Sequence, residues 1–141
     1  MIKLIAFLDG SIYSKSVCEY AAWIAAKVGG SVDLVHVLGR RDESGAPVNL
    51  SGSLLSVTDA SSKANKKLES AAALLRDAGY TVGTTVQAGQ PEAVICEKIK
   101  TGQFDLLLMG AYGHSHIRNL IIGSTTTAMI RFCKIPVLLF R

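Results

Sequence analysis

Residues 104–133 read FDLLLMGAYGHSHIRNLIIGSTTTAMIRFC, and this stretch predicts a strand, a glycine-containing loop and a helix in succession. The run FDLLLMG at 104–110 is almost entirely apolar, as in a strand that is covered on both faces. The hydroxyl-rich run STTT opens an expected helix at 124–133. Three glycines in this region permit tight turns and a close approach of the backbone to another group: Gly110, Gly113 and Gly123. A buried strand followed by a loop and a helix is the repeating unit of parallel α/β sheets.

The rest of the chain repeats this alternation. We expect strands at 2–8, 31–38, 81–87, 104–110 and 135–140, and helices at 14–28, about 58–78, 91–101 and 124–133. The third and the last of these strands are expected near the edges of the sheet, and 39–56 is the longest irregular stretch. The alternation predicts a single α/β domain, 1–141, in which an open parallel five-stranded sheet with right-handed crossovers carries helices on both faces.

The composition argues against several classes of protein. The formal net charge of +4 comes from scattered basic residues, and only 6% of the chain is aromatic, which argues against a nucleic-acid-binding surface. No apolar run approaches the roughly 20 residues of a membrane-spanning helix. The N-terminal run MIKLIAFLDGS has too short an apolar region for a signal peptide, because Asp9 interrupts it, so we expect a cytoplasmic protein. The three cysteines, Cys18, Cys96 and Cys133, form no CxxC spacing, which favours reduced thiols over a zinc or redox site.

The loops after the first and fourth strands are the candidate binding region. In sheets of this kind, ligands bind beyond the carboxyl ends of the strands, where the strand order reverses. The first strand ends at Asp9-Gly10-Ser11 and the fourth at Gly110. A phosphate group needs backbone N–H donors without side chains in the way, and glycines at a helix N-terminus supply them, with hydroxyl groups as further donors. The candidate phosphate-binding residues are Gly110, Gly113, Gly123, Ser124 and Thr125, with His114, His116 and Arg118 as sources of positive charge.

A purely structural interpretation of the same residues stays open at this point. Ser124 could cap the helix by accepting a backbone hydrogen bond, and the glycines could serve only to turn the chain. The sequence contains neither the GK[ST] of a Walker P-loop nor the GxGxxG of a dinucleotide-binding fold. We interpret His36, in a buried strand, and Asp105, at the amino end of the fourth strand, as structural residues.

The glycine spacing has a parallel in a known family. Gly110-x2-Gly113-x9-Gly123-Ser124 resembles the G-2x-G-9x-G-S/T signature of the ATP-binding branch of the universal stress protein family. Further segments resemble family segments in the same order along the chain: LIAFLDGS, VDLVHV, AGQPEAVI, FDLLLMGAYG and IPVLLFR. The resemblance therefore covers the whole chain. It implies a sheet of order 3-2-1-4-5, a Rossmann-like fold similar to that of the adenine nucleotide alpha hydrolases.

The resemblance also implies a binding site for ATP, with Mg²⁺ or Mn²⁺. The residues carried over are Asp9 for the nucleoside, Val37 for the adenine, Met109 and Gly110 for the ribose and phosphate region, and Gly113, Gly123, Ser124 and Thr125 for the phosphates. His114 lies in the same loop and could meet a phosphate. One position departs from the family pattern, because Phe7 stands where many ATP-binding relatives have Pro. Phe7 either narrows the adenine pocket, stacks on the base or belongs to the core.

The resemblance implies regulation in a stress response by a protein that binds ATP, with at most weak hydrolysis. The sequence reveals no nucleophile, base and orienting group that would form a catalytic set. Two alternatives stay open: a dimeric interaction module of the same fold that binds no nucleotide, and a slow ATPase or autophosphorylating protein. The apolar last strand, 135–140, is expected to join two copies in a homodimer, and a protein partner is also expected. The sequence leaves undetermined which stress and which adenine nucleotide are involved, and whether the chain is half of a tandem protein.

Overall fold

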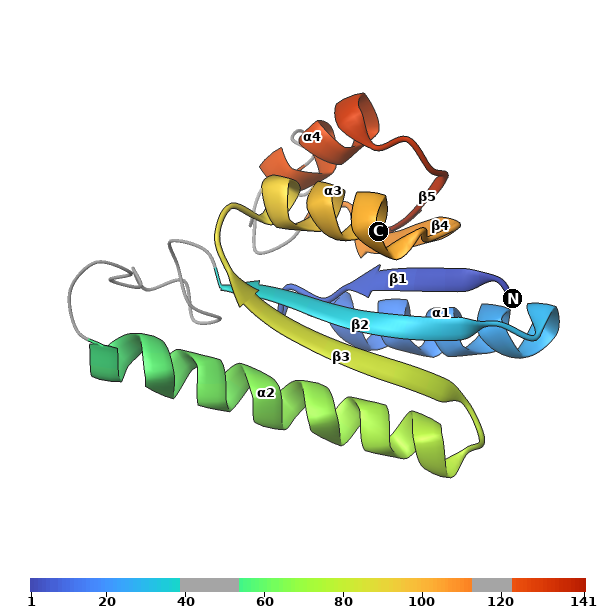
Figure 1. The fold of residues 1–141 in the computed structure, drawn as a ribbon, viewed down its shortest axis with the longest axis horizontal. Helices are drawn as coiled ribbons and strands as arrows, with labels where there is room; N and C mark the ends of the chain where they lie inside the picture. Colours follow the sequence, from blue (N-terminus) through green and yellow to red (C-terminus); the bar gives the residue numbers. More distant parts are fainter. Residues whose placement is uncertain (39–53, 113–122) are drawn as a thin grey trace.

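The computed structural model describes residues 1–38, 54–112 and 123–141, with the side chains of 54–61 excepted. Strands and helices alternate along these residues (Figure 1). The strands are β1 (Lys3–Phe7), β2 (Ser31–Leu38), β3 (Thr81–Ala88), β4 (Leu106–Gly110) and β5 (Val137–Phe140). The helices are α1 (Ser14–Val28), α2 (Leu54–Asp77), α3 (Pro91–Gly102) and α4 (Ser124–Phe132). The predicted alternation of strands and helices is confirmed.

The strands of the described residues form one parallel sheet in the order β3-β2-β1-β4-β5. β1 lies in the middle, where Leu4 is aligned with Val32 of β2 on one side and with Leu106 of β4 on the other. All four strand pairings are parallel. The predicted order 3-2-1-4-5 is confirmed, so the strand order reverses between β1 and β4 while β3 and β5 form the edges.

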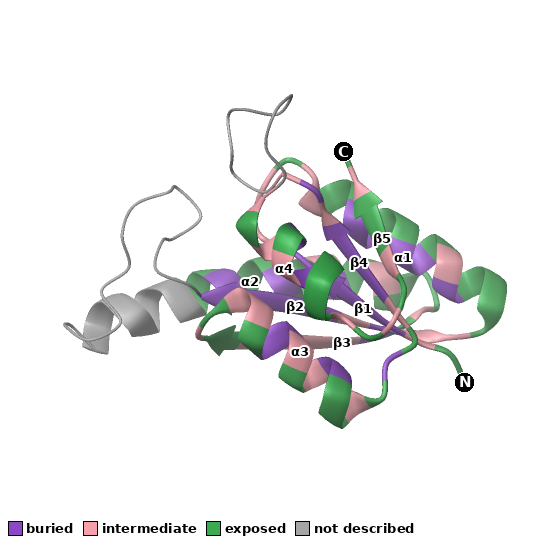
Figure 2. Ribbon diagram, turned by 90° about the horizontal axis from the view of Figure 1, so that it is seen from above, coloured by how far each residue is buried: buried purple, intermediate pink, exposed green. Residues whose placement is uncertain are grey.

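The helices cover both faces of the sheet, with α1 and α2 on one face and α3 and α4 on the other (Figures 1 and 2). Each face has its own cluster of buried side chains. From the β1 segment, Leu4 and Leu8 belong to the cluster beneath α1 and α2, whereas Ile5 and Phe7 belong to the cluster beneath α3 and α4. Successive side chains of a strand point to opposite faces, so a strand covered on both faces is apolar at every position.

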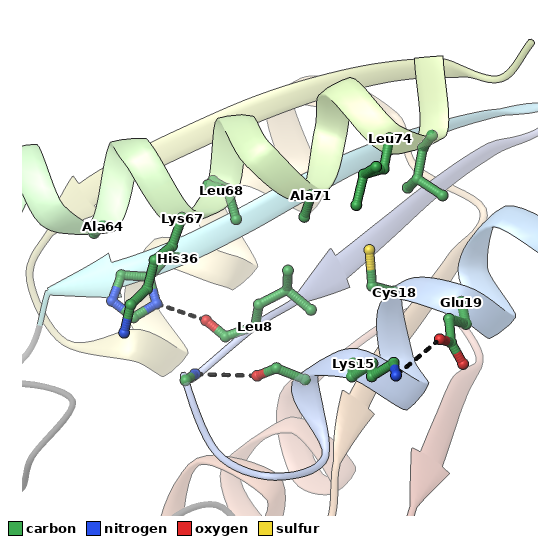
Figure 3. A pocket seen from close by; sticks show the side chains of 13 residues that line it. Leu8, Lys15, Cys18, Glu19, His36, Ala64, Lys67, Leu68, Ala71 and Leu74 are labelled. Atoms are coloured by element: carbon green, nitrogen blue, oxygen red, sulfur yellow. Dashed lines mark hydrogen bonds and ion pairs between the residues drawn. The ribbon is translucent and has the colours of Figure 1, made fainter. Parts of the chain in front are cut away.

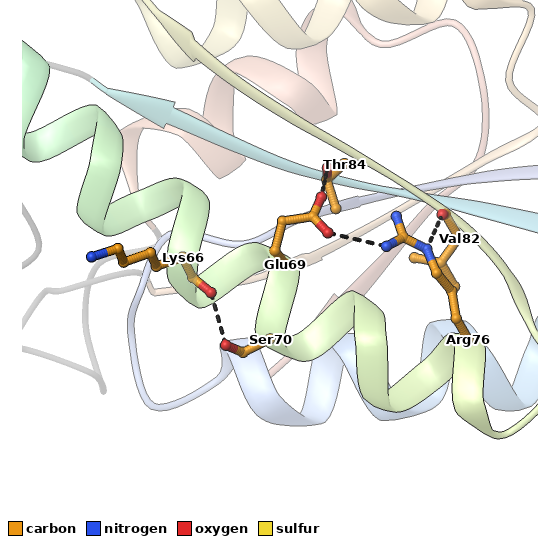
Figure 4. Close-up of polar contacts among 6 residues, drawn as sticks. All are labelled: Lys66, Glu69, Ser70, Arg76, Val82 and Thr84. Carbon is orange, nitrogen blue, oxygen red and sulfur yellow. Dashed lines mark hydrogen bonds and ion pairs between the residues drawn. The ribbon is translucent and has the colours of Figure 1, made fainter.

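A polar cluster on the outside of the molecule joins α2 to the edge strand β3 (Figure 4). Glu69 accepts hydrogen bonds from Thr84 Oγ1 at 2.6 Å and from Arg76 Nη1 at 3.0 Å. Arg76 also donates from Nε to the carbonyl oxygen of Val82 at 3.0 Å. The hydrogen bond from Thr84, and then that from Arg76, lowers the pKa of the Glu69 carboxyl below its ordinary value. These bonds fix α2 against β3 outside the apolar core.

Three predicted boundaries differ from the observed ones by two residues or more. β4 begins at Leu106 rather than at 104, because the carboxylate of Asp105, and not a backbone carbonyl, accepts the Lys3 N–H at 2.8 Å. β5 begins at Val137 rather than at 135, because Pro136 has no N–H to donate to a strand pairing. α2 begins at Leu54, ahead of the expected start near 58, so part of a serine-rich stretch that was expected to be irregular is helical.

The described residues also bear on the expectations drawn from composition. All three cysteines are free thiols, with Cys18 buried and Cys96 and Cys133 half-buried. Among the described residues, no helix combines the length and the apolar character that a membrane span requires. Within the same residues, His, Cys, Asp and Glu side chains do not gather in groups of three or more that could hold a metal ion.

Candidate functional site

The loops that follow β1 and β4 begin at the same end of the sheet, the carboxyl ends of the strands, because these two strands are parallel neighbours. Gly110, the last residue of β4, packs against the loop after β1: a Cβ added to Gly110 would lie 3.2 Å from the Cβ of Tyr13. The ring of Tyr13 also lies near that of Tyr112, with the two centroids 6.3 Å apart. The structure therefore brings together the two loops that the sequence selected.

Asp9 shapes the loop after β1. Its Oδ1 atom accepts a hydrogen bond from the Ser11 N–H at 2.9 Å and another from Ser14 Oγ at 3.3 Å. The Gly10 N–H donates to the same Ser14 hydroxyl at 3.1 Å, and Gly10 has a φ of 79°, which glycine adopts without strain. The half-buried Asp9 carboxylate is thus held in a defined orientation at the edge of the sheet.

The start of α4 is fastened to the end of β4. The Gly123 N–H donates to the carbonyl oxygen of Ala111 at 2.9 Å, and Thr126 Oγ1 donates to the carbonyl oxygen of Gly110 at 3.0 Å. Thr126 is only 2% exposed, so this second hydrogen bond is made in the core. The N-terminus of α4 therefore has a fixed position beside the carboxyl ends of β1 and β4.

The first turn of α4 presents backbone donors at this position. Gly123 is the N-cap, Ser124 is the first helical residue, and no side chain of the described residues caps the helix. Ser124 is therefore the first helical residue and not the N-cap. Ser124 is exposed and Thr125 is half-buried. A helix N-terminus without a side-chain cap offers its N–H groups and its positive dipole end to a ligand or to water.

Gly123 is not required by the backbone that surrounds it. Its φ of −56° is open to every residue type. A Cβ added there would lie 3.5 Å from the Ala111 carbonyl oxygen and 3.6 Å from Tyr112, which are ordinary contact distances. Neither the turn nor the packing of the described residues explains a glycine at this position. A ligand that approaches the backbone closely would explain it.

The side chains of Val37 and Met109 belong to the core beneath the carboxyl ends of the strands. Both belong to the cluster on the α3 and α4 face, where Val37 is 7% and Met109 is 1% exposed. Phe7 is buried in the same cluster at 7% exposed, so its interpretation as a core residue is confirmed. These three side chains pack beneath the carboxyl ends of β1, β2 and β4, where the candidate site lies.

His36 and Asp105 have the structural roles expected of them. The ring of His36 is buried and its Nδ1–H donates to the carbonyl oxygen of Leu8 at 2.7 Å. Asp105 lies at the opposite end of the sheet, where its carboxylate accepts the Lys3 N–H. Four residues of the predicted loop lie outside the described residues: Gly113, His114, His116 and Arg118.

Comparison with known sequences identifies the family. A sequence model described as the universal stress protein family matches residues 1–141. The chain belongs to the universal stress protein family. It is 42% identical over 84 residues to universal stress protein Slr1230 of Synechocystis, a match that covers 60% of this chain and 29% of the relative. It is also 26% identical over 141 residues to universal stress protein MJ0531 of Methanocaldococcus jannaschii, covering 99% of this chain and 81% of the relative.

A further curated relative of this universal stress protein, MJ0577 of Methanocaldococcus jannaschii, is 27% identical over 79 residues, covering 56% of the chain. That match spans 49% of MJ0577, so in two of these three relatives the aligned part is less than half of the protein. In three dimensions the match to MJ0577 extends over nearly the whole chain, with a TM-score of 0.79 at 20% identity, covering 98% of this chain and 94% of that one.

Other solved universal stress proteins share the fold. One, solved in complex with cAMP, has a TM-score of 0.73 at 20% identity, and the match covers 99% of this chain and 96% of that one. Another, from Archaeoglobus fulgidus, was solved in complex with dAMP and has a TM-score of 0.69 at 19% identity, covering 100% of this chain and 98% of that one. At these identities the likeness establishes the fold.

Two residues of this universal stress protein that lie in the site were not selected from its sequence. Tyr13 and Tyr112 meet across the gap between the two loops. The signal was available, because Tyr13 lies in the loop DGSIYS directly after Asp9 and Tyr112 lies between Gly110 and Gly113. An aromatic residue within a glycine-containing loop near a site offers a flat apolar surface, but neither tyrosine belongs to the glycine signature from which the loop residues were predicted.

Proposed function

We propose that the protein is a regulatory module of the universal stress protein family. It binds ATP at the carboxyl ends of the strands, between the loops that follow β1 and β4. The observation that carries this proposal is the start of α4. It has no side-chain cap among the described residues, and it is fastened beside the strand-order reversal by the bonds of Gly123 and Thr126. Anionic groups bind favourably at such helix N-termini. Two similar structures were solved in complex with adenine nucleotides, cAMP and dAMP, which supports the choice of ligand.

In the proposed complex the residues have separate tasks. The phosphates lie against the α4 N-terminus, where Gly123 allows a close approach and Ser124 and Thr125 add backbone and hydroxyl donors. Asp9 receives hydrogen bonds from the nucleoside, and the ends of β2 and β4, at Val37, Met109 and Gly110, border the base and the ribose. Gly113 and His114 are proposed for the phosphates on the strength of the family signature alone.

The proposal includes Mg²⁺ or Mn²⁺ as a companion of the nucleotide. The described residues provide no group of three or more His, Cys, Asp and Glu side chains to hold the ion. Mg²⁺ in nucleotide sites is commonly held by phosphate oxygens and water with one or two protein oxygens. Asp9 and Ser124 each carry a side-chain oxygen near the carboxyl ends of β1 and β4, so they fit an ion that the phosphates carry. A bound divalent ion would neutralise phosphate charge there.

We further propose a homodimer through β5 and a cytoplasmic location. β5 is an edge strand, and its Leu138 and Leu139 are 38% and 36% exposed. An exposed apolar edge strand favours pairing with another chain. The three free thiols favour a reducing compartment. The regulatory output is a change in the surface around the α4 N-terminus on nucleotide binding, which a protein partner recognises.

Calorimetric titration of the purified full chain with Mg-ATP tests the proposal. We expect 1:1 binding in the wild type, weaker binding in Gly123→Ala and loss of binding in Gly123→Val, because a branched side chain would occupy the space of a phosphate. Ala128→Val is the matched control, since it introduces the same side chain in the second turn of α4 without removing a hydrogen bond to Gly123, and it should bind like the wild type. Retained affinity in folded Gly123→Val would refute the phosphate site. No binding in the wild type would favour the interaction module without nucleotide.

A further inference from the structure

The edge strand β5 carries apolar side chains on the face of the sheet that α1 and α2 cover. Leu138 and Phe140 are aligned with Leu108 and Gly110 of β4, and Leu108 belongs to the core cluster of that face. Aligned residues of neighbouring strands point to the same face, so Leu138 and Phe140 lie on the α1 side of β5. Phe140 packs against the cluster, whereas Leu138 is 38% exposed. The outermost strand therefore presents an incompletely covered apolar surface beside α1.

Two aromatic side chains of α1 extend this surface. The Tyr20 ring lies beside the Phe140 ring, with the centroids 5.3 Å apart, and beside the Trp23 ring, with the centroids 6.3 Å apart. Tyr20 is 52% and Trp23 is 56% exposed. Tyr20, Trp23, Leu138 and Phe140 form what we call the α1–β5 patch. A contiguous exposed apolar patch that is rich in aromatic residues is typical of a surface that binds another protein.

The edge strand decides which partner fits the patch. Among the described strands, β5 has a neighbour on one side alone, so its outer side offers backbone N–H and C=O groups for pairing with a further strand. A partner that covers both the patch and this edge must therefore bring an apolar strand of its own. β5 of a second copy meets this requirement, and a two-fold axis makes the same patch face itself. This step rests on the homodimer proposed above.

A symmetric pairing of two β5 strands brings the patches of both copies onto one continuous face. Opposite residues of an antiparallel pair point to the same face, so Leu138 of the second copy lies opposite Leu138 or Phe140 of the first. Neighbouring strands are about 4.8 Å apart, and aromatic rings make contacts at centroid distances of about 4.5–7 Å. Because the Tyr20 ring already lies beside Phe140, the second strand is within its reach and that of the adjoining Trp23.

We propose that Tyr20 and Trp23 of α1 belong to the homodimer interface, where they pack on Leu138 of the second copy. Pairing of the β5 strands sets the register of the two copies, and the aromatic rings supply apolar area that a short strand lacks. Lys27, whose Nζ lies 5.9 Å from the centroid of the Trp23 ring, borders the patch as part of a polar rim. Tryptophan and tyrosine at such places contribute much of the binding free energy of an interface.

The fluorescence of Trp23 tests the location of the interface, because the chain has one tryptophan. The wild type is diluted through the concentrations at which sedimentation shows the dimer dissociating. We expect the emission maximum to move to longer wavelength as Trp23 returns to water. Leu138→Lys, which places a charge on the edge strand, should show the longer wavelength at every concentration. Unchanged emission across the dissociation would overturn the inference while leaving the homodimer in place.

Substitutions at exposed positions test the contribution of the ring. Trp23→Ala should raise the dissociation constant of the dimer at least about tenfold, since each dimer loses two rings, and Trp23→Phe should raise it less. Leu74→Ala is the control, because Leu74 is an exposed apolar residue of α2, which packs on β2 and β3, and it should leave the constant unchanged. The thermal midpoint checks that each variant folds.

Three results would contradict the inference, and they have different consequences. A dissociation constant of Trp23→Ala equal to that of the wild type would overturn the role of the patch alone. An equal effect of Leu74→Ala would overturn the assignment of the interface to the α1–β5 patch. A wild type that sediments as a monomer would overturn the inference together with the proposed homodimer, whereas titration with Mg-ATP tests the nucleotide site separately.

Discussion

The Asp9 carboxylate both shapes its own loop and faces the candidate site, and one substitution separates these two roles. Asp9→Asn keeps an oxygen that can accept the hydrogen bonds of Ser11 and Ser14 but removes the negative charge. A hydrogen bond to a charged group contributes about 1.5–3 kcal/mol, so losing the charge should raise the Kd for ATP about tenfold or more. Calorimetric titration measures this change, and the thermal midpoint should stay near that of the wild type.

Asp9→Ala is the companion variant, because it removes the acceptor as well as the charge. We expect it to lose stability in addition to affinity, since the Ser11 N–H and the Ser14 hydroxyl lose their partner. If Asp9→Asn binds ATP as tightly as the wild type while Asp9→Ala is destabilised, Asp9 has only the structural role.

At single positions, the sequence predicted placement better than it predicted contacts. Asp9, Gly110 and Gly123 lie together at one edge because strand order alone decides where strand ends meet. The bonds that Ser14 and Thr126 make to Asp9 and Gly110 depend on side-chain geometry, which no periodicity encodes. Hydroxyl residues in a loop or first helical turn have many possible partners, so the residue type did not reveal which partner each one finds.

Thr126 joins two elements, and its hydroxyl should therefore affect both stability and the site. Its Oγ1 bonds the Gly110 carbonyl oxygen in the core, so Thr126→Val leaves that oxygen without a partner. We expect a loss of about 1–3 kcal/mol in the free energy of unfolding, measured by urea denaturation. Affinity for ATP should fall too, because the start of α4 is no longer fastened to β4.

Thr126→Ser provides the control for this prediction. It keeps the hydroxyl and removes one methyl group, so it should lose less stability than Thr126→Val and keep its affinity for ATP. The opposite ranking of the two variants would show that packing of the methyl group, and not the hydrogen bond, holds α4 to β4.

The cluster of Glu69, Thr84 and Arg76 makes the attachment of α2 to β3 dependent on pH. The hydrogen bonds of the folded state lower the pKa of Glu69, so the carboxylate form is favoured by folding. This contribution is fully present above the pKa of the unfolded chain and is lost as the pH falls through the lower folded-state value. Urea denaturation of the wild type and of Glu69→Gln should therefore differ near pH 7 and converge in acid, below the ordinary range of a carboxyl pKa.

Thr84→Val tests the main cause of that shift. Since Thr84 gives the largest contribution to the lowered pKa, its removal should reduce the difference between pH 7 and acid in the same direction as Glu69→Gln. A stability difference between wild type and Glu69→Gln that is constant with pH would contradict the prediction, because it would mean that charge plays no part in the contact.

At the level of elements, the apolar periodicity predicted the middle of every strand and helix correctly but placed some of their ends wrongly. The bounds of α1 and β2 agree with prediction because Gly29, which ends α1 at a φ of 66°, marks the boundary in the sequence. β4 and β5 start late because the Asp105 carboxylate takes the place of a backbone carbonyl in accepting the Lys3 N–H, and because Pro136 has no N–H, although apolar residues precede both positions. The hydrophobic pattern indicates which residues are buried, whereas backbone hydrogen bonds set the bounds of a strand. The apolar run and the strand therefore begin at different residues here.

At the scale of the whole molecule, the described residues form one sheet with two distinct faces. The proposed nucleotide site lies at the carboxyl ends of the strands, where the strand order reverses, above the core formed by Phe7, Val37 and Met109. The sequence predicted this place because topology determines it. It did not predict the cavity of about 500 Å³ between α1 and α2, beside Leu8 and Leu68 (Figure 3), because a cavity depends on how far two helices stand apart, which the pattern of each helix alone does not determine.

The proposed homodimer makes a prediction at the same scale. Leu138→Lys places a charge on the exposed edge strand β5, and charged residues on an edge oppose pairing with another chain. Sedimentation at micromolar concentration should show a dimer for the wild type and a monomer for this variant. Val28→Lys, at a position 43% exposed at the end of α1, introduces the same charge elsewhere and should stay dimeric.

Nucleotide affinity measured on the same variants tells assembly and binding apart. Two copies joined symmetrically through β5 run in opposite directions at the junction, so the carboxyl edges of the two sheets face opposite ends of the dimer. Each proposed nucleotide site is then built from one chain, and Leu138→Lys should bind Mg-ATP with the affinity of the wild type although it is a monomer. Loss of ATP binding together with the dimer would mean that the partner contributes to the site, whereas a wild type that sediments as a monomer would exclude β5 as a self-association surface.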